Sequence, residues 1–324
     1  MKILFVSSGN STQGISPIVK SQAESIKKTG LSLDYFPVYG KGLSSYLKHI
    51  FLLRRHLYSG EYDLIHAHYG LCGIVAHLAR RNEKLIVSFM GDDLIGEINK
   101  KGKYSLFGSI LVLLNKIFYK MYDYVIVKSK ELESHIKHNN NAVIPNGVYL
   151  NKFYPIEKQE ARSILSINKD AKIVLFVGDI NREEKNFRLA AEATVLCGDN
   201  SVQLTPVFSI EHEKLKNYYN AADVLILTSF HEGSPNVIKE AMACNCPIVS
   251  TDVGDVKWVF GNSEGCYLTS FKPEDVAQKI KFALEFSEKV GRTKGRERII
   301  ELGLDSETIA KRIIKIYSRV TANN

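Results

Sequence analysis

Short apolar runs alternate with amphipathic segments along the whole chain of 324 residues. The runs are rich in Val, Ile and Leu, and the segments between them place apolar residues three and four positions apart. This alternation is typical of βαβ units and parallel sheets. In the first half it predicts strands at 3–7, 31–37, 64–66, 85–89, 124–127 and 142–144, and helices at 16–29, 43–57, 71–81, 105–120 and 130–138.

The same pattern starts again after the turn Pro145-Asn146-Gly147 and a linker at 151–155. It predicts strands at 173–177, 202–208, 223–228 and 247–251, and helices at 186–197, 211–220, 235–243, 273–287 and 306–319. We therefore predict an α/β protein with two Rossmann-like, doubly wound domains, 1–152 and 153–304, facing each other across a cleft. The last segment, 305–324, carries an apolar stripe and is expected to dock back toward the first domain.

Hydropathy and cysteine usage narrow the class of protein. No apolar run approaches the roughly 20 residues that cross a bilayer, and the first residues lack the apolar core of a signal peptide. The five cysteines are odd in number, with no Cys-x-x-Cys pair and no Cys/His set at zinc spacing. We expect structural thiols and a cytoplasmic location.

Positive charge is concentrated in the first half of the chain. There are 43 Lys and Arg against 35 Asp and Glu, and residues 1–150 hold 19 basic but only 11 acidic side chains. An anionic partner should therefore meet this half. Basic residues interleave with apolar ones between 41 and 55, at Lys41, Lys48, Arg54 and Arg55. This arrangement fits a helix lying on an anionic membrane surface, and a buried apolar face beneath a solvated basic face explains it equally well.

The most informative stretch runs from Ser229 to Ala243 and joins a strand to a helix. Ser234 suits the N-cap of that helix and Pro235 its first position. Free backbone N–H groups at such a junction attract phosphate and other anionic oxygens. Glu232 precedes the helix and Glu240 lies on it among apolar neighbours, where a carboxylate needs a hydroxyl-bearing or cationic partner.

The Glu-x7-Glu spacing from Glu232 to Glu240, followed by Ala-Met-Ala-Cys-Asn-Cys-Pro, resembles the nucleotide-sugar signature of retaining glycosyltransferases of family 4. Pro145-Asn146-Gly147 and Phe176-Val177-Gly178 resemble the same family in the same order. The resemblance covers nearly the whole chain. It implies the GT-B fold, in which two Rossmann-like domains face each other across a cleft.

The resemblance also implies roles for the residues of this stretch. Glu240 would hold the ribose hydroxyls of the nucleotide, and Glu232 would contact hydroxyls of the donor sugar as a catalytic residue. A carboxylate that accepts two hydroxyl hydrogens from a vicinal diol makes strong, charge-assisted bonds. The segment lining the sugar and diphosphate would be Gly233, Ser234, Pro235 and Asn236. The alternative is that Glu232 is a solvated loop residue and Glu240 part of an exposed helix face.

Two basic residues follow the strand at 173–177, and the resemblance implies that they bind the diphosphate. Lys185 matches the family's lysine, whereas Asp179 stands where the family usually has arginine, so Arg182 would have to reach the phosphate from a shifted position. For Arg182 a solvated surface charge is an equal alternative. Cationic compensation of the leaving group lets such an enzyme work without metal. No Asp-x-Asp occurs, so we expect neither a metal nor another cofactor.

Gly14 lies in the glycine-containing loop after the first strand. This loop is not a P-loop, because Ile15 stands where lysine is required. In the family an equivalent loop approaches the donor phosphate and the acceptor, so Gly14 is a candidate backbone donor.

Four further residues of the first half are structural groups, acceptor-side candidates or departures from the family. His66 and His68 lie on one face of a strand; we interpret His66 as structural, and His68 as a candidate contact for the acceptor. Met90 replaces a histidine that is common in the family. Asp93 matches a family aspartate and is either the acceptor's base or an anchor of its loop.

The function hypothesis is a retaining, metal-independent transfer of a sugar from a UDP- or GDP-sugar to a hydroxyl acceptor. The acceptor would be a saccharide or a lipid-linked saccharide in the synthesis of cell-surface polysaccharide, with the protein peripheral at the inner face of the plasma membrane. The alternative is a non-catalytic nucleotide-sugar-binding module or partner subunit. Nucleic acid is not an expected partner, and an oxidoreductase is disfavoured because no Gly-x-Gly-x-x-Gly follows a strand.

Overall fold

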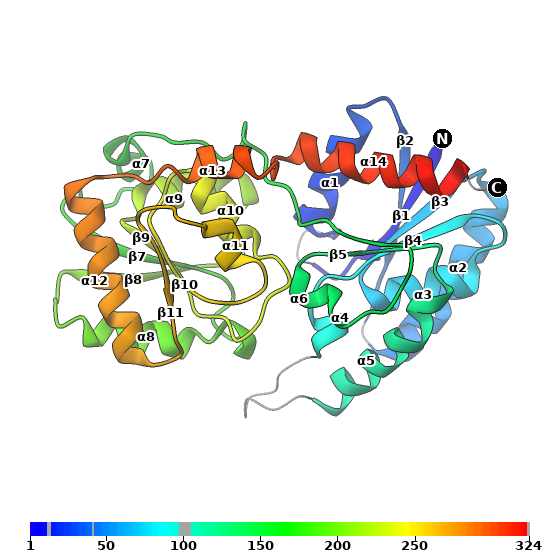
Figure 1. Cartoon of the computed structure of the whole chain (residues 1–324), viewed down its shortest axis with the longest axis horizontal. Coiled ribbons are helices and arrows are strands. Elements are labelled where there is room, and N and C mark those ends of the chain that lie inside the picture. The colour runs from blue at the N-terminus through cyan, green and yellow to red at the C-terminus, as the bar shows by residue number, and fades with distance from the viewer. Residues whose placement is uncertain (12–13, 41, 97–104, 323–324) are drawn as a thin grey trace. The chain divides into compact units, whose positions relative to one another are not determined.

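The chain forms two compact units, each built around its own parallel sheet (Figure 1). This computed structural model describes all residues except 12–13, 41, 97–104 and 323–324. The first unit takes the described residues up to Gly147 together with those from Ser306, and the second takes Val148–Asp305. Lys41, one of the four predicted basic residues, lies outside the described residues.

The first unit has a six-stranded sheet in the order β2-β1-β3-β4-β5-β6. All paired strands are parallel, as the apolar runs predict. The strands are β1 (Lys2–Ser8), β2 (Ser32–Val38), β3 (Leu64–His68), β4 (Lys84–Ser88), β5 (Tyr124–Val127) and β6 (Asn141–Val143). The helices are α1 (Pro17–Lys27), α2 (Leu43–Ser59), α3 (Gly70–Ala79), α4 (Asp92–Ile95), α5 (Leu106–Phe118), η1 (Tyr119–Met121), α6 (Lys130–Glu133) and α14 (Ser306–Ala322).

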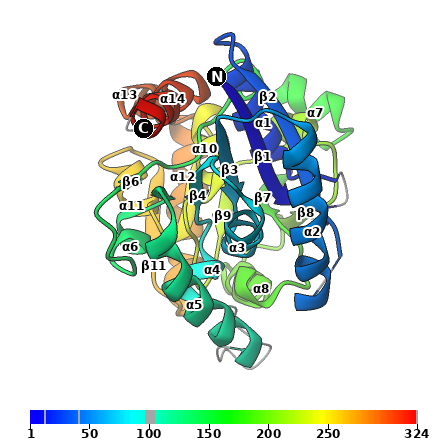
Figure 2. The same ribbon diagram turned by 90° about the vertical axis from the view of Figure 1, so that its right-hand side faces the viewer.

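Helices cover both faces of this sheet. Buried residues of α2 and α3 pack with one face of the strands in a single apolar core. The last helix, α14, packs against α1 (Figures 1 and 2). Its Tyr317 is fully buried and reaches His66 of β3. The predicted return of the last helix to the first domain is thus confirmed.

The second unit has a five-stranded parallel sheet in the order β11-β10-β9-β7-β8. Its strands are β7 (Lys172–Val177), β8 (Val202–Val207), β9 (Val224–Leu227), β10 (Ile248–Thr251) and β11 (Cys266–Thr269). Its helices are α7 (Lys158–Ile164), η2 (Glu183–Lys185), α8 (Phe187–Leu196), η3 (His212–Lys214), α9 (Leu215–Ala221), α10 (Asn236–Ala243), α11 (Val256–Phe260), α12 (Pro273–Lys289) and α13 (Gly295–Glu301). Apolar residues of α8 and α12 pack on β7, β9 and β10 as its core.

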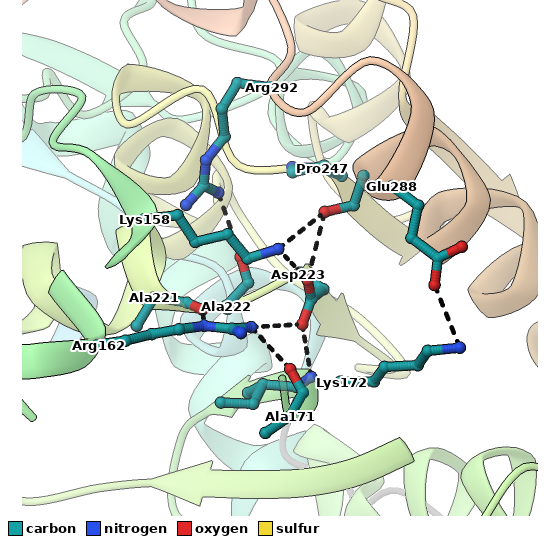
Figure 3. Close-up of polar contacts among 12 residues, drawn as sticks. Lys158, Arg162, Ala171, Lys172, Ala221, Ala222, Asp223, Pro247, Glu288 and Arg292 are labelled. Carbon is teal, nitrogen blue, oxygen red and sulfur yellow. Dashed lines mark hydrogen bonds and ion pairs between the residues drawn. The ribbon is translucent and has the colours of Figure 1, made fainter. Parts of the chain in front are cut away.

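A buried ion network closes the amino-terminal end of this second sheet (Figure 3). Asp223, just before β9, accepts hydrogen bonds from the Arg162 guanidinium at 2.9 Å and from the backbone N–H of Ile173 at 2.7 Å. Lys158 of α7 pairs with the same carboxylate. Arg162 and Asp223 are both buried, and a buried charge needs an opposite charge beside it. Each of these two side chains provides that partner for the other. The network therefore connects α7 to the amino-terminal ends of the strands, opposite to their carboxyl ends.

Several elements differ from the sequence predictions. The helix predicted at 130–138 ends at Glu133, because the amides of His135 and Ile136 bond to carbonyls only three residues back. This turn brings Ile136 into the core. The sequence pattern also missed α4, α7, α11, α13 and the strand β11.

Candidate functional site

The loop after β9 and the start of α10 form the centre of the candidate site. The helix begins at Asn236, so Pro235 occupies the N-cap position and the predicted cap at Ser234 is wrong. Ser234 instead donates to Asp255 Oδ2 at 2.6 Å and accepts from the buried ammonium of Lys239. Charged partners bind the hydroxyl more strongly than a backbone amide would. Pro235 has no N–H, so the amides available here belong to its neighbours.

Glu232 and Lys185 meet although they lie on different loops. Lys185 Nζ is 2.6 Å from Glu232 Oε1, and Ser229 Oγ donates to the same oxygen at 2.8 Å. The two loops follow the adjacent strands β7 and β9 and are joined further by Phe230 N–H, which donates to the carbonyl of Glu184 at 2.9 Å. The side chains of Lys185 and Glu232 keep 21% and 15% exposure, so both remain accessible to a ligand.

Glu240 is held by two partners that the sequence analysis did not identify. His212 Nε2 donates to Glu240 Oε1 at 2.7 Å, and the hydroxyl of Tyr219 donates to Oε2 at 2.8 Å. Burial alone would lower the pKa of His212, but the hydrogen bond and charge of Glu240 outweigh it and raise that pKa. Burial and the carboxylate raise the pKa of Tyr219 well above its ordinary value, so its hydroxyl stays a donor. Glu240 is thus a fixed carboxylate, with lone pairs left for further donors.

Lys239 forms a second buried pair beside these residues. Its side chain is fully buried, and its ammonium lies 3.5 Å from Asp255 Oδ2. Burial lowers the pKa of Lys239, against the opposing effect of Asp255. The pair joins α10 to the loop after β10, and Ser234 joins the loop after β9 to the same carboxylate. At Gly254, φ is +59° and an added Cβ would lie 2.7 Å from the carbonyl oxygen of Gly233, so the two loops are in close contact.

Arg182 lies on the same loop as Lys185 but pairs with a different glutamate. Its guanidinium pairs with Glu184 and its side chain is 53% exposed. Asp179, at the position of the family's arginine, accepts hydrogen bonds from the backbone and side chain of Asn181 within its own loop. The structure therefore brings Lys185 to Glu232 and leaves the side chain of Arg182 largely exposed. Its role in phosphate binding stays a prediction.

In the first unit, Asp93 is fully buried at the start of α4. Its carboxylate accepts backbone N–H groups of Gly70 at 2.9 Å, Met90 at 3.0 Å and Gly91 at 2.9 Å. Burial raises the pKa of Asp93 to about 6 despite these hydrogen bonds. Such contacts are those of a loop anchor, one of the two predicted roles, and the general-base role stays a prediction.

His66 and His68 lie on one face of β3, as predicted, with their rings stacked 4.3 Å apart. His66 bonds to the hydroxyl of Tyr317 at 2.5 Å and to Ser88 Oγ at 2.8 Å, which makes it structural. His68 Nε2 is buried without a hydrogen-bond partner among the described residues. Burial, with the nearby charge of Lys128, lowers the pKa of His68, so its ring is neutral at pH 7. A neutral ring with an unused nitrogen can bond a hydroxyl, as expected of an acceptor contact.

Gly14 does not offer a free backbone donor as predicted, because its N–H already donates to the carbonyl of Ser11 at 2.9 Å. Its φ of +78° and the open space around its Cα fit a backbone that a ligand could approach. Among the described residues, no group of three His, Cys, Asp or Glu side chains is placed to hold a metal ion. Metal independence stays a prediction.

Two family models match the chain. One, described as glycosyl transferases group 1, matches residues 159–285, and the other, described as glycosyltransferase family 4, matches residues 21–152. The chain belongs to glycosyltransferase family 4. No described helix of this family member is long and apolar enough to cross a membrane.

Relatives agree with this family. The chain is 27% identical over 243 residues to TuaC of Bacillus subtilis, named as a teichuronic acid biosynthesis glycosyltransferase, with 67% of this chain and 60% of TuaC aligned. It is 24% identical to a D-inositol 3-phosphate glycosyltransferase of Geodermatophilus obscurus, with 69% of this chain and 60% of that protein aligned. The match thus spans about 60% of the length of these relatives.

Solved structures confirm the GT-B fold. Sucrose-phosphate synthase from Thermosynechococcus elongatus superposes with a TM-score of 0.84 at 20% identity, over 100% of both chains. HepE of Anabaena, in complex with UDP-glucose, superposes with a TM-score of 0.75 at 17% identity, over 98% of this chain and 100% of that one.

The residues that the sequence analysis missed had little local signal. His212 lies 28 positions from Glu240, and Tyr219 lies 21 positions away, so only the folded chain brings them together. Lys239 did carry a signal, because it stands between Ile238 and Glu240 on a helix whose neighbours are apolar. A lysine at such a position needs a buried anion, which is Asp255.

Proposed function

We propose that this chain transfers a sugar from a nucleoside diphosphate sugar, of UDP or GDP, to a hydroxyl group of an acceptor. The observation that carries the proposal is the pairing of Lys185 with Glu232 beside the start of α10, with Glu240 fixed on that helix. These groups lie at the carboxyl ends of β7 and β9, where ligands bind in open parallel sheets. Family membership and the complex of HepE with UDP-glucose support the same donor class.

The donor would engage each group through a distinct part. Glu240 would accept the ribose hydroxyls, because His212 and Tyr219 already hold both of its oxygens in place. Lys185 would turn from Glu232 to the diphosphate, which leaves the Glu232 carboxylate for hydroxyls of the sugar. The N–H groups at the start of α10 add positive potential near the phosphates. With this compensation we propose that departure of the diphosphate needs no metal, and that attack occurs on the same face of the sugar, with retention.

For the acceptor we propose a lipid-linked saccharide in the synthesis of a cell-surface polysaccharide. The name of TuaC supports the class of pathway. The excess of basic residues within 1–150 supports an acceptor that carries phosphate. The protein would then work on the cytoplasmic face of the membrane.

Donor binding is the first test. Thermal unfolding is followed with UDP, GDP and their sugars, because a ligand at 100 times its Kd stabilises the folded state by about 2.7 kcal/mol. Release of the nucleoside diphosphate is then measured with saccharide acceptors, with and without EDTA. We expect one base to stabilise the protein, and turnover to survive EDTA.

Variants separate transfer from mere binding. Glu232→Gln should lower kcat at least 100-fold with little change in donor Kd, and Lys185→Met should weaken the donor at least tenfold. Lys289→Met, at a lysine with 71% exposure on α12, is the matched control and should leave both values unchanged. A Glu232→Gln protein as active as the parent would overturn the proposal. Donor binding without turnover on any acceptor would instead identify a binding module, which the positions of Met90 and Asp179 would then explain.

A further inference from the structure

Helix α5 is apolar on both of its sides. Leu111 and Asn115 face the interior of the first unit and are buried. On the opposite side, Ile110, Leu113 and Ile117 form a stripe at helical spacing with exposures of 44%, 60% and 53%. A surface helix of a water-soluble domain normally turns polar residues to this side. The stripe on α5 therefore exposes apolar side chains where polar ones are expected.

Helix α2 carries a similar exposed stripe. Leu53 and Leu57 are fully buried in the core, while Leu47, Phe51 and Leu52 are exposed to 57%, 76% and 44%. Single exposed apolar residues are normal, but contiguous groups mark interaction sites. We define the docking face as six exposed apolar residues of these two helices, Leu47, Phe51, Leu52, Ile110, Leu113 and Ile117.

The two stripes belong to one side of the first unit. Both α2 and α5 pack against α3, which lies between them in both views (Figures 1 and 2). The outer side of α3 adds Leu78, which is 43% exposed. The helix α3, with its exposed Leu78, thus lies between the apolar stripes of α2 and α5.

Charge decides which partner fits this face. Exposed cations accompany both stripes, namely Lys48, Arg54 and Arg55 on α2, and Lys116 and Lys120 on and after α5. None of α2, α3 and α5 contains an acidic residue. A second copy would bring cations against cations, which is unfavourable. An anionic bilayer instead accepts the apolar side chains below its headgroups and the cations among its phosphates.

We propose that the docking face binds an anionic phospholipid bilayer, with α2 and α5 lying in the plane of the interface. Buried apolar side chains and basic residues near the surface each add to the affinity, and the electrostatic part is weakened by salt. The inference rests on the proposed function only for the reason why the protein would bind a membrane, namely that a lipid-linked acceptor would be presented at that surface. Binding itself requires neither donor nor transfer.

Vesicle sedimentation tests the proposal with the full chain and no nucleotide. Vesicles of phosphatidylcholine with 30 mol% phosphatidylglycerol, on the order of what carries a strong surface potential, are compared with phosphatidylcholine alone. We expect at least tenfold tighter partition onto the anionic vesicles at about 50 mM salt, and at least a tenfold loss at about 500 mM. Equal partition onto both vesicles, or none onto the anionic ones at low salt, would overturn it.

Variants place the interaction on the surface. The double variant Phe51→Glu/Leu113→Glu should lose at least tenfold in partition, since both side chains are exposed and neither supports the core. Val195→Glu is the matched control, because Val195 on α8 of the second unit is also exposed, to 80%. Loss of binding in this control equal to that of the double variant would contradict the assignment.

Two further measurements distinguish membrane binding from misfolding of the variants and from self-association. Circular dichroism melts of each variant should match the parent, and the single variants Phe51→Ser and Leu113→Ser replace the double variant if it does not fold. Sedimentation velocity without lipid reports self-association. A dimer that the docking-face variants dissolve would overturn the proposal in favour of a second copy. A protein that binds vesicles but shows no sugar transfer would refute the proposed function and leave this inference standing.

Discussion

His212 gives the candidate site a measurable pH dependence. Its pKa is raised in the folded state, chiefly by Glu240 against the effect of burial. A raised pKa stabilises the fold fully below the unfolded value of about 6.5 and loses that contribution as the pH rises through the folded value. We expect His212→Asn to reduce the unfolding free energy by about 1.5 kcal/mol more at pH 6 than at pH 9, the size of a hydrogen bond to a charged group.

Urea denaturation of parent and variant at a series of pH values measures this difference directly. His135→Asn, at an exposed histidine, is the control and should show a flat difference. If the His212→Asn difference is equally flat, Glu240 does not hold a protonated histidine.

Lys239 is a buried charge that contacts both Ser234 and Asp255 at the candidate site. With Lys239→Met, Asp255 keeps its charge in a buried position but loses its ammonium partner. Removing one member of a buried ion pair costs about 3–5 kcal/mol. We expect a loss of that size in urea denaturation, whereas Lys281→Met at an exposed lysine of α12 should change stability by less than about 0.5 kcal/mol. The double variant Lys239→Met/Asp255→Asn should recover much of the loss, and no recovery would refute the pairing.

The sequence identified the charged residues of the site better than their partners. Glu232, Glu240 and Lys185 stand at a spacing that marks the family, and the structure brings Lys185 to Glu232. The sequence could not reveal the hydrogen bonds from His212 and Tyr219 to Glu240, because these bonds join segments that no local pattern connects. The predicted cap at Ser234 failed for a related reason. Rules of local structure cannot foresee that a buried lysine and a buried aspartate will both bond to the Ser234 hydroxyl and so take it away from a capping role.

The contact between the loops after β9 and β10 depends on Gly254. An alanine there would adopt an unfavourable φ of +59° and place its Cβ 2.7 Å from the carbonyl oxygen of Gly233. Gly198 has a similar φ of +66° but nothing within 4 Å of an added Cβ. Both Gly→Ala variants should therefore lose about 1–2 kcal/mol for the left-handed backbone.

Only Gly254→Ala should also displace the loop that carries Glu232 to Asn236. We expect its donor Kd to rise at least tenfold, which is about 1.4 kcal/mol, while that of Gly198→Ala stays within twofold of the parent. Isothermal titration with the nucleotide found to bind measures both. Equal affinities in the two variants would show that the contact does not shape the donor site.

The sequence predicts strands best where nearly all of their side chains are buried. The strands β1, β4, β5 and β9 are buried along most or all of their length, and each contains a continuous apolar run. The edge strand β11 is only half-buried, so its four residues show neither a run nor an alternation. Helices α7, α11 and α13 have seven residues or fewer, which is too short for a stripe of period 3.6 to emerge.

The division of the chain into units depends on contacts that no periodicity records. The stripe on α14 predicts that the helix docks, but its partner comes from the opposite end of the chain, since Tyr317 and His66 are 251 positions apart. Likewise, the order of the strands in each sheet follows from packing over both faces rather than from any one segment. Sequence patterns fix local structure, whereas the arrangement of the elements requires the folded chain.

The placement of the donor candidates in one unit predicts where a nucleotide acts. Lys185, Glu232 and Glu240 all belong to the second unit. Amide hydrogen exchange reports local opening free energies, and bound ligand raises them where it contacts the chain. Saturating nucleoside diphosphate should therefore slow exchange at least tenfold in peptides covering 178–186 and 228–240, and much less in those covering 64–72. Glu240→Gln, which would weaken the proposed ribose contact, should reduce this protection at equal ligand concentration. Protection confined to the peptides of 64–72 would place the nucleotide in the first unit and contradict the assignment of the donor site.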